Sequence, residues 1–198
     1  MRKFIYIIIL MFPCVLQAAP ATPAQVAFAE EYLNGIKTVV SDFIQEASSG
    51  DISTGTFFLS RPGKLRWQYN PPVPILIVGN KGIITYYDAE LDEVSYIKDG
   101  ETLASFLTRP EIKFSGDIEV KSAESSDKVM RITLALKEKA DDGSMTLVFE
   151  EAPFMLRKIE LTDAANNTTS INLNNPKFGV AIEDKLFTFK NPKLNKKR

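Results

Sequence analysis

The sequence predicts an α+β domain that is mainly β, with a meandering antiparallel sheet of about eleven strands, one N-terminal helix and a few short helical turns. Short alternating or β-branched apolar runs recur from Thr38 onward, and clusters of Ser, Asp, Gly and Asn separate them. Connections this short join antiparallel neighbours. A sheet of so many strands must curl, and two helices without a second sheet are candidates to fill or cap the enclosed space.

The first 18 residues have the pattern of a secretory signal peptide. Arg2-Lys3 precede an apolar run from Phe4 to Leu16, which is too short to span a bilayer comfortably, and Ala18 occupies the −1 position of a cleavage site. Cys14 raises the alternative of a lipoprotein signal, but small residues do not precede it. We therefore expect cleavage after Ala18, which leaves one exported domain, residues 19–198, without cysteine.

The mature chain begins with an amphipathic helix. Thr22-Pro23 combines an N-cap residue with proline at the first helical position, and the apolar residues Val26, Ala29, Leu33 and Ile36 fall on one face. The β-branched and aromatic content then rises from Thr38 to Ala47, which predicts the first strand.

The segment from Gly55 to Pro72 predicts a hairpin with a large aromatic face. Phe57 and Leu59 alternate with smaller or polar residues, and the turn Arg61-Pro62-Gly63 follows. Leu65, Trp67 and Tyr69 then alternate with Lys64, Arg66 and Gln68. One face of this hairpin is therefore apolar, and it carries the chain's single tryptophan.

The rest of the chain continues the β pattern, with one interruption. Leu103, Phe106 and Leu107 fall at i, i+3 and i+4, so we expect a short helix from Glu101 to Thr108. The other strands are predicted at Ile75–Val78, Ile83–Tyr87, Val94–Lys98, Ile118–Ala123, Val129–Leu136, Met145–Glu150, Met155–Thr162, Thr168–Leu173 and Leu186–Phe189.

The composition excludes several kinds of chemistry. The chain has no histidine, so zinc sites and the Ser-His and Cys-His nucleophilic pairs are excluded, and we expect neither a metal nor a cofactor. A formal net charge of −1 carries no basic surplus for nucleic acid. Ser125 and Lys128 have serine-lysine spacing but fall in a polar turn, and the acidic Asp88–Asp92 segment lacks the glycine of a calcium loop. We expect a protein that is not an enzyme.

Bulky apolar residues on the predicted strands and the short helix exceed what a small curled sheet needs. Taken singly, each is better explained as a core residue. Taken together they favour an apolar space enclosed by the sheet, although periodicity alone leaves both alternatives open. The residues concerned are Phe43, Phe57, Leu65, Trp67, Tyr69, Tyr86 and Phe106.

Two motifs give the chain a resemblance to the periplasmic outer-membrane lipoprotein carrier family, LolA. Phe43-x-Gln45 and the segment Thr102–Leu107 fit the same pattern, whereas the second half agrees only in strand spacing. The motifs are Gly55-x-Phe57-x-x-x-Arg61-Pro62-Gly63-x-x-Arg66-Trp67-x-Tyr69-x-x-Pro72 and Tyr86-Tyr87-Asp88-x-x-Leu91-x-x-Val94.

The resemblance implies an unclosed eleven-stranded β-barrel with a helical lid over a hydrophobic cavity. It implies a monomeric periplasmic chaperone that takes acylated lipoproteins from an inner-membrane ABC transporter and delivers them to an outer-membrane receptor. Arg61 matches the arginine that latches the lid in the closed form. The cavity lining would comprise Phe43, Phe57, Leu65, Trp67, Tyr69 and Tyr86, and the lid Leu103, Phe106 and Leu107.

One turn departs from the family pattern, and rival functions stay open. Asn80-Lys81-Gly82 stands where family members usually have Asp-Gly-Lys, which leaves the geometry of that hairpin in question. The main alternative function is a periplasmic regulator that senses a lipid or a partner on the same half-barrel. A lipid-anchored acceptor of the same pathway would require Cys14 as its mature N-terminus.

Overall fold

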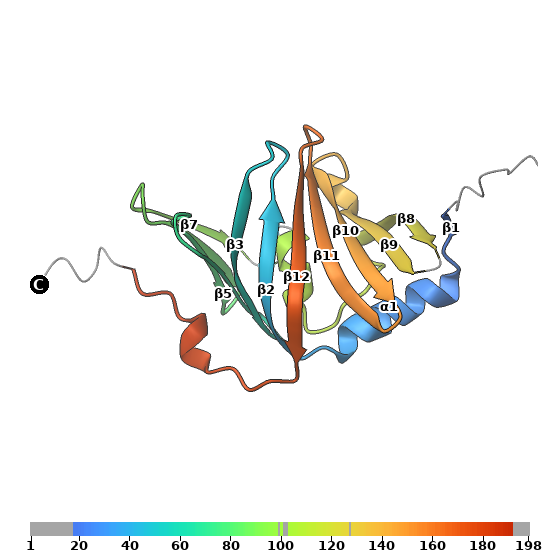
Figure 1. The fold of residues 1–198 in the computed structure, drawn as a ribbon, viewed down its shortest axis with the longest axis horizontal. Coiled ribbons are helices and arrows are strands. Elements are labelled where there is room, and N and C mark those ends of the chain that lie inside the picture. Colours follow the sequence, from blue (N-terminus) through green and yellow to red (C-terminus); the bar gives the residue numbers. More distant parts are fainter. Residues whose placement is uncertain (1–17, 99, 101–102, 127, 192–198) are drawn as a thin grey trace, which may run out of the picture.

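Twelve antiparallel strands form one curved sheet in the computed structural model, which describes residues 18–98, 100, 103–126 and 128–191 (Figure 1). The order across the sheet is β1-β8-β9-β10-β11-β12-β2-β3-β4-β5-β6-β7. Within the described ranges, the edge strands β1 and β7 do not pair with each other, so the barrel is unclosed. The strands are β1 Ala19–Pro20, β2 Thr38–Glu46, β3 Ile52–Ser60, β4 Lys64–Tyr69, β5 Ile75–Asn80, β6 Ile83–Asp88, β7 Glu93–Lys98, β8 Ile118–Ser125, β9 Val129–Leu136, β10 Gly143–Glu151, β11 Phe154–Asp163 and β12 Thr168–Phe178.

The sheet consists of two meanders joined in the middle. Strands β2 to β7 pair in chain order, as do β8 to β12, which the short connections predict. The seam between them pairs β12 with β2, placing Ile171 opposite Gln45 and Leu173 opposite Phe43. Local sequence patterns carry no signal for this seam, because its partners lie more than a hundred residues apart. The short edge strand β1, paired with β8, was not predicted either.

The predicted N-terminal helix is confirmed as α1, Pro23–Gly35. The Thr22 side chain accepts a hydrogen bond from the Gln25 backbone, while the Gln25 side chain bonds back to the Thr22 backbone. This capping box satisfies two amides that the first helical turn would leave free. Ala29 and Leu33 are buried, and Tyr32 makes edge-to-face contacts with Phe149 of β10 and Phe154 of β11. The helix therefore packs against the β10–β11 half of the sheet (Figure 1).

Three short 3₁₀ segments complete the fold: η1 Leu103–Thr108, η2 Lys137–Lys139 and η3 Asp184–Phe187. The strand predicted at Leu186–Phe189 was wrong, because η3 and the residues after it lie on a face of the sheet and not at an edge. Phe187 is fully buried there, and side chains hold the backbone: Arg66 donates to the Leu186 carbonyl and Asn80 to the Phe187 carbonyl. The alternating apolar residues of this segment are therefore wholly or partly buried, but the segment pairs with none of the described strands.

The β5–β6 hairpin has a regular geometry despite its departure from the family pattern. Lys81 and Gly82 have φ values of 53° and 77°, and Asn80 pairs with Ile83 across them. Two successive left-handed residues make the tight turn whose twist suits a two-residue hairpin. The moved glycine therefore leaves the strand register intact.

The predicted signal peptide lies almost wholly outside the described residues, which begin at Ala18, so it stays a prediction. Among the helices that the structure describes, none is long and apolar enough to cross a membrane. The core lies between the concave face of the sheet and the helices, and its largest fully buried members include Phe43, Phe106, Phe149, Ile132 and Leu147.

Candidate functional site

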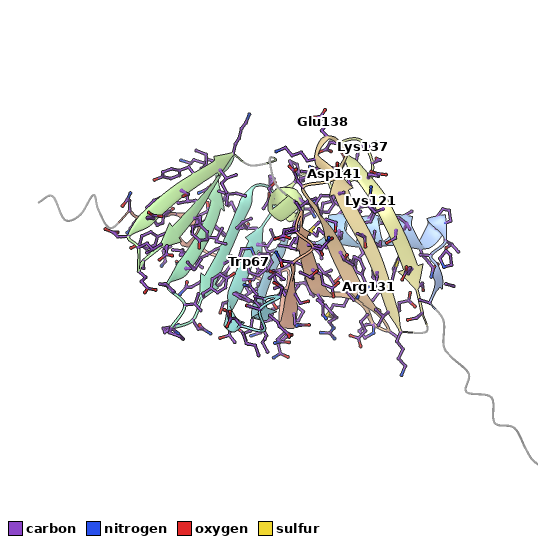
Figure 2. All side chains as sticks on the ribbon, turned by 90° about the horizontal axis from the view of Figure 1, so that it is seen from above. Trp67, Lys121, Arg131, Lys137, Glu138 and Asp141 are labelled. Carbon is purple, nitrogen blue, oxygen red and sulfur yellow. The ribbon has the colours of Figure 1, made fainter. Side chains whose placement is uncertain are left out.

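A half-open cavity of about 600 Å³ lies on the concave face of the sheet. Strands from both meanders supply its wall, and η1 supplies its cover through Leu103 and Leu107. The view from above places Trp67 near the middle of the curved sheet (Figure 2). The apolar wall residues are Leu65, Trp67, Ile77, Ile84, Leu136, Met145, Ile159, Leu161 and Ile171.

The structure divides the predicted lining residues into two groups. Leu65, Trp67 and Tyr69 of β4 line the cavity. Phe43 is 1% exposed and lies behind them, with its ring centre 5.0 Å from that of Trp67 and 5.1 Å from that of Tyr69. Phe57 stacks on Trp67 at 4.2 Å between ring centres and borders a separate small pocket. Phe43 and Phe57 thus support the wall without lining the larger cavity.

Tyr86 occupies an outer position on the same concave face. It is 37% exposed and lies opposite Ile77, a wall residue, but it is not among the residues that line the cavity. Burial raises the pKa of Tyr69, and the nearby Tyr86 hydroxyl raises it further. Tyr86 therefore extends the apolar face beyond the enclosed volume.

The predicted lid residues also take two positions. Leu103 and Leu107 face the cavity, whereas Phe106 is fully buried and stacks with Phe114. Leu107 also borders the small pocket on the other side, together with Leu33, Phe57 and Arg61. The side chain of Leu107 therefore separates the two spaces.

Arg61 joins the end of α1 to the segment just after η1 through five hydrogen bonds to neutral oxygens. It donates to the carbonyls of Leu33 and Ile36 and to the side-chain oxygen of Asn34 at the end of α1. It also donates to the carbonyls of Arg109, at 3.0 Å, and Pro110, just after η1. Burial lowers the pKa of the guanidinium from its usual value. The guanidinium thus loses contact with water and instead donates hydrogen bonds to oxygens at the end of α1 and just after η1.

Asn34 and a second side chain of α1, Glu30, also hold the segment after η1, and the sequence did not indicate them. Asn34 accepts from the Ile112 amide and donates to the Ile112 carbonyl, both at 2.8 Å. Glu30 accepts from the Phe114 amide. An asparagine in the last turn of a helix indicates such a contact only weakly. Its side chain tends to form hydrogen bonds to nearby backbone groups and is therefore uncommon in helix interiors.

One end of the cavity is polar, at the β9–β10 and β11–β12 connections. The Tyr69 hydroxyl donates to the Gln45 side-chain oxygen at 2.7 Å, and Thr169 lies on the neighbouring strand. Apart from Tyr69 and the Phe43-x-Gln45 motif, no sequence pattern indicated that these polar residues lie together. The remaining polar lining residues are Lys139, Asp142, Gly143, Ser144, Thr162, Asp163 and Asn167.

Ser125 of the serine-lysine pattern and Asp88 of the acidic segment both have structural partners. The Ser125 hydroxyl donates to Glu151 at 2.7 Å and accepts from the Gln25 amide. Asp88 accepts from the backbone amides of Glu90 and Leu91. Throughout the described part of the chain, no group of three or more His, Cys, Asp or Glu residues could hold a metal ion.

The fold and the cavity define a class of protein: an unclosed β-barrel whose concave face holds an apolar cavity under a short helical cover. The chain belongs to the LolA family, described as outer membrane lipoprotein carrier proteins, because residues 34–190 match the model of that family. This family membership confirms the resemblance indicated by the hairpin motifs.

Several relatives cover most of the chain. The outer-membrane lipoprotein carrier protein of Methylococcus capsulatus is 28% identical over 97% of this chain and 96% of its own length. The one from Dechloromonas aromatica is 30% identical over 82% and 81%. An uncharacterized protein of Rickettsia prowazekii is 26% identical over 98% and 90%. A crystal structure of an uncharacterized conserved protein from Thermus thermophilus superposes with a TM-score of 0.51 at 10% identity, covering 86% of this chain and 96% of that one, which shows a shared fold.

Proposed function

We propose that the protein is a periplasmic carrier that encloses the acyl chains of lipoproteins and delivers them to the outer membrane. The observation that carries the proposal is the 600 Å³ apolar cavity beneath η1, in a chain of the LolA family. The named relatives are called outer-membrane lipoprotein carriers, which supports the same role for this chain.

The energetics of an acyl chain explain why a carrier is needed. Exposing a sixteen-carbon chain to water costs about 12 kcal/mol at about 0.8 kcal/mol per methylene group. A wall of leucine, isoleucine, methionine and tryptophan side chains removes that contact with water.

The volume of the cavity matches about one such chain. If a methylene group occupies roughly the volume of a water molecule, about 30 Å³, then 600 Å³ holds about twenty of them. A ligand with two or three acyl chains exceeds this volume, so we propose that the cover moves and that the small pocket beyond Leu107 joins the cavity.

Arg61 is suited to hold the closed form reversibly. Its partners are neutral carbonyl and amide oxygens, so opening the cover breaks no ion pair, and the guanidinium regains water as the contacts are lost. We propose that this arginine latches the empty state and that entry of lipid releases it. A closed state that competes with the loaded one also helps the ligand to leave.

The partners would be those of the carrier pathway. We propose that the protein receives acylated lipoproteins from an inner-membrane ABC transporter, crosses the periplasm as a monomer and hands them to an outer-membrane receptor. A triacylated ligand could not make that journey unshielded, for the energetic reason given above.

The test is to purify the protein from periplasm and to identify bound acylated proteins by mass spectrometry. The proposed function predicts co-purified lipoproteins and, on depletion of the protein, lipoproteins retained in the inner membrane. Empty protein together with normal outer-membrane sorting on depletion would contradict the carrier and favour the sensing regulator. Intact mass after secretion would test the predicted cleavage after Ala18.

A further inference from the structure

The polar end of the cavity contains hydrogen-bond donors without partners in the described part of the protein. The Tyr69 hydroxyl uses the Gln45 side-chain oxygen as its acceptor, at 2.7 Å, which leaves the Gln45 amide NH₂ directed elsewhere. Within the described chain, neither this NH₂ group nor the Thr169 hydroxyl makes a hydrogen bond to another residue, although both residues line the cavity.

The register of the β2–β12 seam brings these two donors to one place. Gln45 lies opposite Ile171, and Thr169 is two residues further along β12, so its side chain is on the same face. Diagonal neighbours of this kind lie about 7–8 Å apart. Gln45 and Thr169 can therefore contact one polar group between them or two that are adjacent.

The nearby acidic groups do not compete strongly for these donors. Both carboxylate oxygens of Asp163 already accept hydrogen bonds, from the Ala165 and Asn167 amides and from the Asn167 side chain. Asp142 is exposed at the rim. The interior end of the cavity, by contrast, is bounded by apolar side chains, including Leu65 and Leu107.

We propose that Gln45 and Thr169 bind the ester or amide carbonyl oxygens that join acyl chains to the head of the ligand, so that a chain enters with its tail toward Leu65 and Leu107. The inference rests on the proposed function and gives it a ligand orientation. Carbonyl oxygens only accept hydrogen bonds. When a ligand displaces water from the mouth of the cavity, its carbonyl oxygens must find donors there or stay unsatisfied. The two residues would thus distinguish acyl esters and amides from plain hydrocarbon.

The experiment compares two probes that differ only at the carbonyl groups. One is a short peptide with an N-terminal dipalmitoyl-S-glyceryl cysteine, and the other is its dihexadecyl ether analogue. Trp67, the single tryptophan, lines the cavity, so its fluorescence reports binding of either probe. The variants are Gln45→Met and Thr169→Val, which remove a donor at nearly constant size. Gln68→Met is the matched control, because Gln68 is exposed and not among the residues lining the cavity.

We expect each cavity variant to bind the ester probe about three- to tenfold more weakly than the original protein, as the loss of one neutral hydrogen bond predicts. Binding of the ether probe should not change, and the control should bind both probes normally. Gln45→Met also leaves the Tyr69 hydroxyl without its acceptor. The double variant Gln45→Met, Tyr69→Phe removes that complication and should show the same selective loss.

Two results would overturn the inference while leaving the carrier function in place. One is an equal loss for ester and ether probes, which would show that the two residues only shape the wall. The other is unchanged binding of both probes by the variants. Failure of the unsubstituted protein to bind either probe would instead contradict the proposed function itself. Thermal unfolding of each variant confirms that the binding data come from folded protein.

Discussion

Arg61 donates hydrogen bonds both to the end of α1 and to the backbone just after η1, and its removal is the sharpest test of the proposed latch. We expect Arg61→Leu to take up lipoprotein but to release it poorly to an outer-membrane acceptor, because the closed state no longer competes with the loaded one. The measurement is transfer of a labelled lipoprotein from the carrier to outer-membrane vesicles.

Arg66→Leu is the matched control for that experiment. Arg66 lies on the same hairpin, burial also lowers its pKa, and it also donates to a carbonyl, but that carbonyl belongs to Leu186 and not to the cover. Normal transfer by Arg61→Leu, or an equal defect in Arg66→Leu, would contradict the latch.

Aromatic residues near the cavity differ in whether they support the wall or form it. We expect Phe43→Ala to lower the free energy of unfolding by about 3–5 kcal/mol, because its buried ring contacts both Trp67 and Tyr69 and would leave a void. Tyr86→Ala, at a 37% exposed site on the same face, should change it by less than about 1 kcal/mol. Urea unfolding monitored by far-ultraviolet circular dichroism measures both. Similar losses in the two variants would show that burial does not distinguish these residues.

At the scale of single residues, sequence patterns identify the aromatic face but not each ring's place in it. Alternation puts Phe43 and Tyr69 on the concave side, yet only the pairing of Phe43 with Gly55 lets its ring lie buried over that glycine instead of in the cavity wall. Arg61 could be proposed as a latch only through family resemblance, because four of its five acceptors are backbone carbonyls, which carry no sequence signal. No sequence pattern indicated that Thr169 lines the cavity, because its place beside Gln45 depends on the pairing of β12 with β2.

At the scale of elements, the segment that follows η1 is anchored by a pair whose strength depends on pH. Arg109 makes two hydrogen bonds to Asp117, at 3.0 and 2.6 Å, and they hold the pKa of the Asp117 carboxyl below its usual 3.8. A lowered folded-state pKa means that the stabilisation is complete above about pH 4 and is lost as pH falls through the lowered value. The Arg109 carbonyl accepts from Arg61, so this pair also positions an acceptor of the proposed latch.

We therefore expect Asp117→Asn to lower stability at pH 7 by less than about 1 kcal/mol, because Asp117 is mostly exposed, and the difference from the original protein to shrink below pH 4. Urea unfolding midpoints measured from pH 7 to pH 3 give this comparison. A difference that stays constant down to pH 3 would show that the charge of Asp117 is not the cause.

The elements themselves were largely predictable because their signals are local. The Thr22 cap, the β-branched runs and the polar turns fixed α1 and the strands β2 to β12 to within a few residues. The exception was the strand predicted at Leu186–Phe189, whose alternating pattern reflects the burial of Phe187 against a sheet face. Strand pairing within each meander followed from short connections, whereas the β12–β2 seam did not, because pairing between distant segments depends on the closing of the whole fold.

At the scale of the whole molecule, the protein consists of a continuous hydrogen-bonded sheet and a cover, η1 with the segment up to Phe114, which shares the apolar core of the sheet but is joined to the rest by few hydrogen bonds. The cover is held by backbone and side-chain hydrogen bonds: the Gly63 amide to the Thr108 carbonyl, the Ile112 amide to Asn34 and the Phe114 amide to Glu30. Strand β10, by contrast, is paired along its length on both sides. A ligand larger than the cavity should break the hydrogen bonds that hold the cover and leave the strand pairing of β10 unchanged.

Hydrogen exchange of the backbone amides, measured with and without the dipalmitoyl peptide, tests whether the cover opens while the sheet stays paired. We expect the amides of Gly63, Ile112 and Phe114 to exchange faster in the loaded protein, because their acceptors lie on elements that separate when the cover lifts. The amides of β10 serve as the internal control and should keep or increase their protection, since a bound ligand stabilises the folded state by mass action. Increased protection at Gly63, Ile112 and Phe114 on loading would mean that the cover closes over the ligand, and it would contradict both the opening and the role of Arg61 as a latch for the empty form.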